Sequence, residues 1–419
     1  MSRILLSAYA CEPGKGSEPE VGWMWATELT AAGHEVWVIT REANRRTIET
    51  RQGRESKGNL HFVYCDLPRW LRKWKRGGTG VYWYYAVWQW CAYQVARRLT
   101  RSVQFDCAQH VTFVGLRAPS FMGWLGLPFV LGPVSGGESV PHQLRKGMST
   151  QAKLREWLRN VANRAVPLDP MMRASFRRAQ RILVTTEASR RLIPGAFQAK
   201  CEVQLGVGLN REYLGWTGPG SRSPAAALRV LYVGRLLEWK GVDFALRAVQ
   251  ALRHRGVAVR FTIVGSGPAE ERLRRLAREL ELGNELRWLK WVSRPELDEY
   301  YYQSDLLLFP SLRDSGGMVV LEALAHGLPV VCTDCGGPGL IVNERCGRVV
   351  QTKDRCREEV VAGFTDEMDQ LGRNRALLAR LSRGARARAW EFDFQKVVTR
   401  VHPVERETSD ASSLQGKLA

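Results

Sequence analysis

The stretch from Leu231 to Leu340 most constrains how this chain can fold. It contains three apolar runs, each followed by a short loop of glycine or charged residues and then a helix-like segment. This order predicts consecutive β-α units of a parallel sheet. In the last unit, Leu306 to Phe309 is the expected strand, Pro310 to Gly317 the loop and Met318 to Ala325 the helix. The sequence therefore predicts an α/β fold.

The loop and helix of that last unit contain two carboxylates and an expected anion site. Seven residues separate Asp314 from Glu322, which places one carboxylate in the loop and the other on the helix. The main-chain N–H groups of Gly316, Gly317 and Met318 would point out of the helix N-terminus, where unpaired donors and the helix dipole favour an anion. We predict a phosphate site there, with a hydroxyl-binding carboxylate on either side.

Two cations follow an earlier strand of the same stretch. The run L-R-V-L-Y-V-G-R-L-L-E-W-K-G starts at Leu228, so that Gly234 and Arg235 end the strand and Lys240 precedes the next helix. Arginine and lysine over one strand edge can neutralise a diphosphate, the first as a fork and the second as a point charge. The alternative is that they form surface ion pairs with Glu238.

The first half of the chain opens in a similar way. Residues 3–40 read as strand, loop, helix and strand, which is the start of a doubly wound domain. Gly14 and Gly16 in the loop would let a backbone approach a ligand at the strand's carboxyl end, although glycines also serve ordinary turns. A later strand ends at His110, for which a structural role is the alternative to ligand contact.

The length of 419 residues exceeds one ordinary core and predicts two domains. A stretch rich in Gly, Ser and Pro reads as the linker between them. The expected parts are a first domain at 1–205, the linker at 206–227, a second domain at 228–385, a segment crossing back to the first domain at 386–407, and a disordered tail at 408–419.

The formal net charge of +20 requires an explanation. Candidate partners are nucleic acid, an anionic membrane surface or a phosphorylated substrate, and the alternative is solubilising surface charge. Pro68 to Arg101 interleaves Trp and Tyr with Lys and Arg, a mixture that the headgroup zone of a bilayer favours. The other readings are aromatics that fill a core and stacking on single-stranded nucleic acid. A second basic stretch, His142 to Arg181, favours one electropositive face.

The cysteines and the hydropathy indicate a compartment. Nine scattered cysteines suit a reducing cytoplasm. Cys332 and Cys335 form C-x-x-C without a paired second motif, so we expect small core cysteines and no zinc site. No apolar run reaches the length of ~18 residues needed to span a membrane, and Ile4 to Ala8 is too short for a signal peptide. We therefore expect a cytoplasmic protein.

With these residues in view, the second half resembles the retaining enzymes of glycosyltransferase family 4. That family has the GT-B fold, in which two Rossmann-like domains face a cleft. Its pattern of Glu, seven residues and a second Glu is matched here in spacing, in the glycines and in the continuation E-A-L-A-H-G-L-P-V from Glu322. Asp314 stands in place of the first Glu, and its shorter side chain must lie closer to reach the same hydroxyl.

The resemblance implies a role for each of the candidate site residues of the second half. Glu322 would bind the ribose hydroxyls of a nucleotide, and Asp314 with the amides of Gly316 to Met318 would bind the transferred sugar. Arg235 and Lys240, next to Gly234, would bind the diphosphate. Because these cations are built into the chain, no metal or other cofactor is expected.

Two residues of the first half also have counterparts in the family. Gly16 aligns with a first-loop glycine near the phosphate, and His110 with a histidine that touches the donor sugar. The implied reaction moves a sugar from a UDP- or GDP-linked donor to a glycan acceptor, held as a polyprenyl diphosphate at the inner membrane face for surface polysaccharide synthesis. The alternatives are a non-catalytic donor-binding protein, a sugar-nucleotide epimerase of the same architecture and, against our expectation, a nucleic-acid-binding protein.

Overall fold

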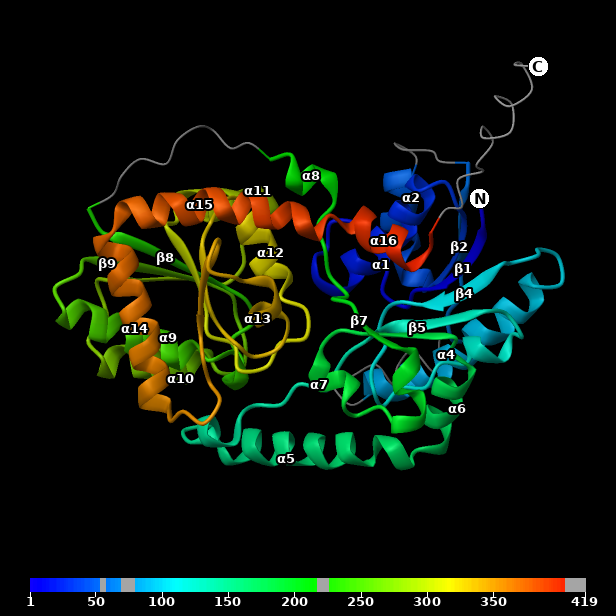
Figure 1. Cartoon of the computed structure of the whole chain (residues 1–419), viewed down its shortest axis with the longest axis horizontal. Coiled ribbons are helices and arrows are strands. Elements are labelled where there is room, and N and C mark those ends of the chain that lie inside the picture. Colours follow the sequence, from blue (N-terminus) through cyan, green and yellow to red (C-terminus); the bar gives the residue numbers. More distant parts are fainter. Residues whose placement is uncertain (53–57, 69–79, 217–225, 404–419) are drawn as a thin grey trace, which may run out of the picture. The chain divides into compact units, whose positions relative to one another are not determined.

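The computed structural model describes residues 1–52, 58–68, 80–216 and 226–403 (Figure 1). The chain divides into two compact units. The first combines Met1–Phe113 and Phe121–Phe129 with the segment that starts at Gln395. The second combines Val114–Ser120 with Val130–Phe394. The domain boundaries expected from the sequence remain predictions, and the expected tail at 408–419 lies outside the described residues.

The first sheet has seven strands in the order β3-β2-β1-β4-β5-β6-β7. Neighbouring strands pair in parallel, with Ile4 opposite Val36 in the pair of β1 and β2. Both of these side chains are fully buried, as expected for parallel strands covered on both faces. The strands are β1 Arg3–Ser7, β2 Glu35–Thr40, β3 Leu60–Tyr64, β4 Cys107–His110, β5 Phe129–Val134, β6 Arg181–Val184 and β7 Cys201–Val203.

Helices connect these strands. The start of α6 follows from its sequence, because the Asp169 carboxylate accepts hydrogen bonds from the N–H groups of Met171 and Met172 and Pro170 occupies the first turn. The helices in this part of the chain are α1 Ser17–Ala31, α2 Arg45–Gln52, α4 Gly80–Leu99, α5 Thr150–Ala165, α6 Pro170–Arg178 and α7 Glu187–Arg190.

The aromatic residues of α4 divide between core and surface. Tyr84, Tyr85 and Trp88 are buried, which agrees with the core reading of this segment. Trp83 and Trp90 are exposed on the same helix. Residues 69–79, which include most of the basic side chains of this stretch, lie outside the described residues.

The second sheet has six parallel strands in the order β10-β9-β8-β11-β12-β13. Alternate residues of its strands pack into two different clusters: Tyr232 and Leu308 belong to one, and Leu231 and Phe309 to the other. Because successive strand residues point to opposite faces, the two clusters are the cores on the two faces of the sheet. The strands are β8 Leu228–Val233, β9 Val259–Val264, β10 Leu286–Leu289, β11 Leu306–Phe309, β12 Val330–Thr333 and β13 Gly347–Val350.

Helices cover both faces of the second sheet (Figure 1). Residues of α9, α10 and α14 belong to the first of its two clusters and residues of α12 to the second. The helical stretch that ends at Ala389 divides at Asn374, whose side chain accepts from the N–H of Leu377 and caps α15. The helices of this part of the chain are α8 Arg211–Leu214, α9 Val242–His254, α10 Glu270–Glu279, α11 Arg294–Gln303, α12 Met318–Ala325, α13 Gly337–Ile341, α14 Arg357–Arg373 and α15 Arg375–Ala389. The last helix, α16 Phe394–Val401, belongs to the first unit from Gln395 onward.

The structure confirms the expected fold class, an α/β protein with two parallel sheets. Strand, loop and helix of the unit around Asp314 fall where the sequence predicts them. Among the described helices, none combines the length and the hydropathy that crossing a bilayer requires.

Candidate active site

The predicted site residues of the second half gather where the chain order of the second sheet reverses. From β8 the chain continues to β9 on one side, and β11 pairs with β8 on the other side. The loops that leave the carboxyl ends of β8 and β11 therefore diverge, and ligands of doubly wound sheets bind at such a point. Lys240 lies in the loop after β8 and Asp314 in the loop after β11.

Close backbone packing fixes these two loops against each other. Gly241 has a φ of 68°, and a Cβ atom there would stand 2.1 Å from the carbonyl oxygen of Pro310. The N–H of Leu312 donates to the carbonyl of Trp239 over 2.9 Å. Only glycine fits at position 241, because any side chain would force the loops apart.

Lys240 and Asp314 form a direct ion pair. The Lys240 ammonium lies against the Asp314 Oδ2 atom, and both side chains are mostly buried. The ammonium also lies 5.2 Å from the centre of the Phe309 ring, within range of a cation–π interaction. The alternative pairing with Glu238 is absent for Lys240, since the Glu238 carboxylate accepts instead from the Ser149 hydroxyl at 2.6 Å.

The second oxygen of Asp314 occupies part of the predicted anion site. Asp314 Oδ1 accepts hydrogen bonds from the N–H groups of Gly316 at 3.2 Å and Gly317 at 3.1 Å. A short carboxylate that bonds backbone N–H groups two and three residues ahead is a local turn typical of aspartate. A ligand phosphate or sugar would therefore exchange with Asp314 at these two amides, whereas Met318 begins α12 itself.

Glu322 is buried on α12 and bonded by two residues of α11. Its Oε2 atom accepts from the Tyr301 hydroxyl at 2.9 Å, and its Oε1 atom lies 3.0 Å from an Arg294 nitrogen. Burial, and then the Glu322 charge, raise the pKa of Tyr301 well above its usual value, so the phenol remains a donor. Arg294 also lies over the Tyr213 ring, 4.5 Å from its centre. Sequence reasoning did not single out Arg294 or Tyr301.

Arg235 differs from Lys240 because its guanidinium is exposed. Its backbone carbonyl is held by the Tyr232 hydroxyl at 3.1 Å, which fixes the loop where the side chain starts. Among the described residues, no carboxylate forms an ion pair with Arg235. Gly234 precedes it with a φ of 152°, and Gly265 approaches so closely that a Cβ there would lie 1.9 Å from the Gly234 carbonyl oxygen.

His110 and Gly16 belong to the first unit. His110 ends β4 with no exposed surface, and its Nε2 atom lies 3.0 Å from the Tyr85 hydroxyl and 3.4 Å from the Gln89 amide nitrogen. Burial lowers the pKa of His110 to about 4, so the imidazole is neutral near pH 7. Gly16 precedes α1 with a φ of 62°, and a Cβ at that position would meet open space.

The cysteines of the second half are free thiols that differ in burial. Cys332 and Cys346 are buried, as expected of small core residues, whereas Cys356 is exposed. Burial raises the pKa of Cys335 to about 11, which keeps this thiol protonated. Within the described ranges, no group of three His, Cys, Asp or Glu side chains is placed to hold a metal ion.

Comparison with known proteins assigns the second half to a family. Residues 221–388 match the model of the glycosyl transferases group 1. A putative colanic acid biosynthesis glycosyltransferase, WcaL of Escherichia coli, is 33% identical over 159 residues, which are 35% of this chain and 39% of the relative. A D-inositol 3-phosphate glycosyltransferase of Saccharomonospora viridis is 31% identical over 255 residues, 56% of this chain and 57% of the relative. The chain thus matches about two fifths to three fifths of these relatives' lengths.

Solved structures match over nearly the whole chain. WaaG, a glycosyltransferase involved in lipopolysaccharide biosynthesis, has a TM-score of 0.61 at 17% identity and covers 96% of this chain and 100% of its own. HepE of Anabaena, solved in complex with UDP-glucose, has a TM-score of 0.57 at 16% identity and covers 96% and 98%. The fold is therefore GT-B, and residues 221–388 form a domain of the glycosyl transferases group 1 family.

Proposed function

We propose that this protein is a retaining glycosyltransferase that moves a sugar from a nucleotide diphosphate sugar to an acceptor hydroxyl. The observation that carries the proposal is the pairing of Lys240 with Asp314 at the switch point of the second sheet. Exposed Arg235 starts from the same loop as Lys240, and buried Glu322 lies on the helix that follows Asp314. Cations for a diphosphate and carboxylates for hydroxyls thus lie on adjoining loops of one domain.

The rate of such a transfer depends on the departure of the diphosphate. Negative charge grows on the leaving oxygen as the anomeric carbon becomes cationic, and fixed donors that meet this charge lower the barrier by about 3–4 kcal/mol each. Lys240 and Arg235 would supply that charge, with Lys240 exchanging Asp314 for phosphate oxygens when the donor binds. No metal is required in this scheme, because the cations belong to the chain.

Retention follows, in this proposal, from attack on the same face that the leaving group departs from. No carboxylate is assigned as a nucleophile, and the departing phosphate takes the proton of the acceptor hydroxyl. Asp314 would position a sugar hydroxyl together with the Gly316 and Gly317 amides that it now occupies. Glu322 would accept from the ribose hydroxyls, since a carboxylate oxygen can accept more than one hydrogen bond.

The donor is a nucleotide sugar carrying UDP or GDP. Support comes from HepE, a protein of the same fold whose structure contains UDP-glucose. We also propose, from the family resemblance, that His110 contacts the donor sugar and Gly16 the donor phosphate. The neutral state of the buried His110 suits a hydrogen bond with a sugar hydroxyl, because a neutral imidazole both donates and accepts.

The acceptor we propose is a glycan on a polyprenyl diphosphate, reached from the cytoplasmic face of a membrane. Relatives named for colanic acid and lipopolysaccharide biosynthesis support an acceptor of surface polysaccharide type. A net charge of +20 suits an anionic lipid surface. On α4, Trp83, Val87 and Trp90 are exposed at helical spacing, and exposed tryptophan is typical of proteins that contact headgroups.

A donor-binding protein without transferase activity is the second candidate. The observation that favours it is the occupation of the Gly316 and Gly317 amides by Asp314, the residue that stands where the resembled family has glutamate. Both candidates require donor binding, and only the first requires turnover. The spacing of Asp314 and Glu322 fits a sugar-nucleotide epimerase poorly, and nucleic-acid binding would leave the glycines of the predicted anion site unexplained.

The test is incubation of the purified protein with a panel of UDP- and GDP-sugars, first by melting temperature and then by transfer to a lipid-linked glycan acceptor. We expect one nucleotide sugar to raise the melting temperature and to be consumed with retention of anomeric configuration. Arg278→Ala, which removes an exposed arginine of α10, is the matched control for Arg235→Ala. Stabilisation without any transfer would favour the second candidate, and no stabilisation by any nucleotide sugar would contradict both.

A further inference from the structure

Helix α5 (Thr150–Ala165) presents its apolar residues to the outside. Leu154, Trp157, Leu158 and Val161 have exposed fractions of 54%, 56%, 52% and 44%. Their spacing of three, four and seven residues places them on one side of a helix, where they form a single stripe. A surface helix ordinarily turns such a stripe toward the core, so an outward stripe indicates a surface that contacts something else.

The inward side of α5 is polar, which fixes the orientation of the helix. Glu156 is buried and accepts from the N–H of Val140 at 2.9 Å, and it also pairs with Arg313. Arg159 and Asn163 donate to the carbonyl of Gly136 at 2.7 and 2.9 Å. Rotating α5 to bury its apolar stripe would leave these buried polar groups without partners, at a cost of about 1–3 kcal/mol for each group. The outward direction of the stripe is therefore built into the packing.

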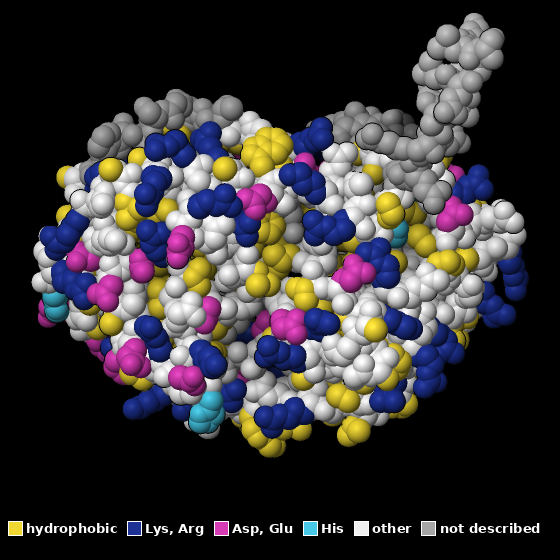
Figure 2. All heavy atoms as spheres, viewed as in Figure 1, with side chains coloured by type: hydrophobic (Ala, Val, Ile, Leu, Met, Phe, Trp, Pro, Cys, Tyr) yellow, Lys and Arg dark blue, Asp and Glu magenta, His cyan; other side chains and the backbone are white. Residues whose placement is uncertain are grey.

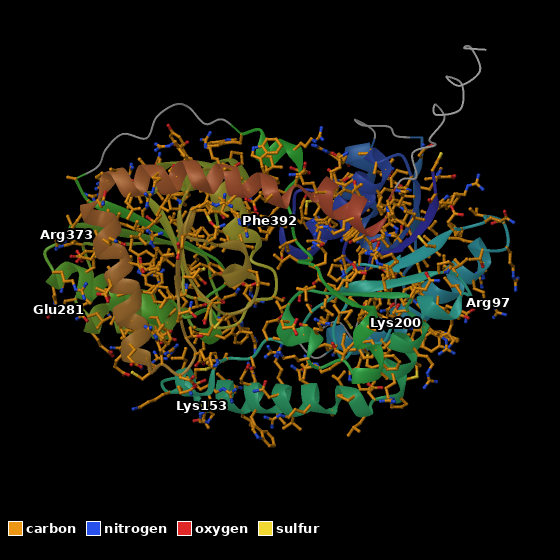
Figure 3. All side chains as sticks on the ribbon, viewed as in Figure 1. Arg97, Lys153, Lys200, Glu281, Arg373 and Phe392 are labelled. Atoms are coloured by element: carbon orange, nitrogen blue, oxygen red, sulfur yellow. The ribbon has the colours of Figure 1, made fainter. Side chains whose placement is uncertain are left out.

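Basic residues border the stripe on both sides. At 3.6 residues per turn, Lys153 and Arg164 lie along one side of it and Arg155 along the other, and all three are exposed. The one acidic residue of α5, Glu156, is buried. Figure 2 shows hydrophobic and basic side chains interleaved along the lower margin of the view, over α5, and Figure 3 labels Lys153 near the start of this helix.

Exposed apolar residues also follow α5 in the sequence. Leu168 and Met171 follow in the next turns of the chain and are 81% and 40% exposed. The sixteen residues of α5 extend over about 24 Å. An amphipathic helix of this length, with lysine and arginine beside an apolar face that contains tryptophan, is suited to lie in the plane of a lipid headgroup region.

We propose that α5 docks the protein on an anionic lipid bilayer, with Leu154, Trp157, Leu158 and Val161 inserted between headgroups and Lys153, Arg155 and Arg164 bound to lipid phosphates. This deepens the proposed function, since it names the element that brings the donor site to a lipid-linked acceptor. A second copy of the chain fits the stripe less well, because pairing two α5 helices would bring like charges together. Nucleic acid fits less well because leucine and valine provide no stacking surface.

The experiment measures flotation of the full chain with vesicles of phosphatidylcholine and phosphatidylglycerol, and with vesicles of phosphatidylcholine alone. We expect binding to the mixed vesicles that weakens as salt is raised. Trp157→Ser should weaken this binding about tenfold, as expected for removing one large inserted side chain. The matched control is Trp291→Ser, because Trp291 is 82% exposed and lies outside α5; it should bind like the unchanged protein.

A second pair of variants tests the basic border. Lys153→Glu with Arg164→Glu should abolish the preference for mixed vesicles, whereas Arg275→Glu with Arg278→Glu on α10 makes the same change in net charge and should weaken binding less. Equal vesicle binding by Trp157→Ser and the unchanged protein would overturn the proposal. So would a dimer in solution that Trp157→Ser separates without any vesicle binding, because the stripe would then be an interface between copies. The rise in melting temperature caused by the nucleotide sugar is measured on the same variants. A variant that loses vesicle binding but keeps this rise has lost docking and not donor binding.

Discussion

The Lys240 ammonium and the Asp314 carboxylate are paired across the point where the chain order of the second sheet reverses. They are 74 positions apart in the sequence and come together because β8 and β11 are neighbours. The cation that we propose binds a diphosphate is thereby kept in place by the carboxylate that we propose binds a sugar. Donor binding would separate the two, so each should matter differently to stability and to turnover.

Replacing Lys240 by alanine should remove sugar transfer and leave the fold intact. We expect kcat to fall by about 10²–10³-fold, the usual loss when one fixed donor to a developing negative charge is removed. The fold should survive with a lowered melting temperature, because Asp314 keeps its bonds to the Gly316 and Gly317 amides but loses the partner of a mostly buried ion pair. Steady-state kinetics with whichever nucleotide sugar the panel identifies measures this effect. Near-normal kcat in Lys240→Ala would refute the role assigned to the lysine.

Asp314→Asn and Asp314→Ala should separate the two functions of this side chain. Asparagine keeps an oxygen that can accept from the Gly316 and Gly317 amides but loses the charge that holds Lys240. Alanine loses both, and the absent cap should cost about 1 kcal/mol of stability beyond the asparagine variant. Thermal unfolding measures the difference. Equal melting temperatures for the two variants would show that the bonds to the amides contribute nothing.

Gly241→Ala should be far more harmful than Gly256→Ala, although both glycines have positive φ. At position 256 a Cβ meets nothing within 4 Å, so the cost is the backbone strain of about 1–2 kcal/mol. At position 241 a Cβ would collide with the Pro310 carbonyl, which raises the expected cost to about 2–5 kcal/mol. Melting temperatures compare the two directly. The same collision would displace Lys240, so kcat should fall in Gly241→Ala alone.

The burial of His110 predicts a loss of stability as the pH falls. Its pKa is lowered to about 4 in the folded chain, against about 6.5 for an ordinary histidine. Below pH 6.5 the unfolded chain therefore binds the proton more readily, and the stability supplied by the neutral imidazole is lost between pH 6.5 and pH 4. The full contribution is about 3 kcal/mol. His110→Asn should reduce the drop in melting temperature between pH 7 and pH 5, and an unchanged drop would contradict the burial argument.

Apolar runs and turn residues were sufficient to predict that the second half contains a parallel sheet, because such a sheet, buried on both faces, needs continuous apolar strands. The strand at Leu306–Phe309 and the helix from Met318 follow directly from that pattern. Motif spacing placed Lys240 and Asp314 near the same sheet edge. It could not show that they pair with each other, since that depends on the order of strands in space.

Other parts of the site and surface could not be read from the sequence. Arg294 and Tyr301 bond Glu322 from α11, and neither belongs to a motif that would distinguish it from other surface or core residues. The hydrogen bonds from the Gly316 and Gly317 amides to Asp314 depend on the detailed conformation of the loop, which the sequence does not specify. The sequence also could not show that Trp157 faces outward, because helical periodicity predicts an apolar stripe but not whether the stripe faces the core or the solvent.

The most direct test of the account is the rise in melting temperature that nucleotide sugars produce in the unchanged protein, in Arg235→Ala and in Lys240→Ala. A donor present at about a hundred times its Kd should stabilise the unchanged protein by about 2.7 kcal/mol. We predict that this stabilisation is largely lost in both variants and kept in Arg278→Ala. Equal stabilisation of Arg235→Ala, Lys240→Ala and the unchanged protein would contradict the claim that these two cations bind the diphosphate.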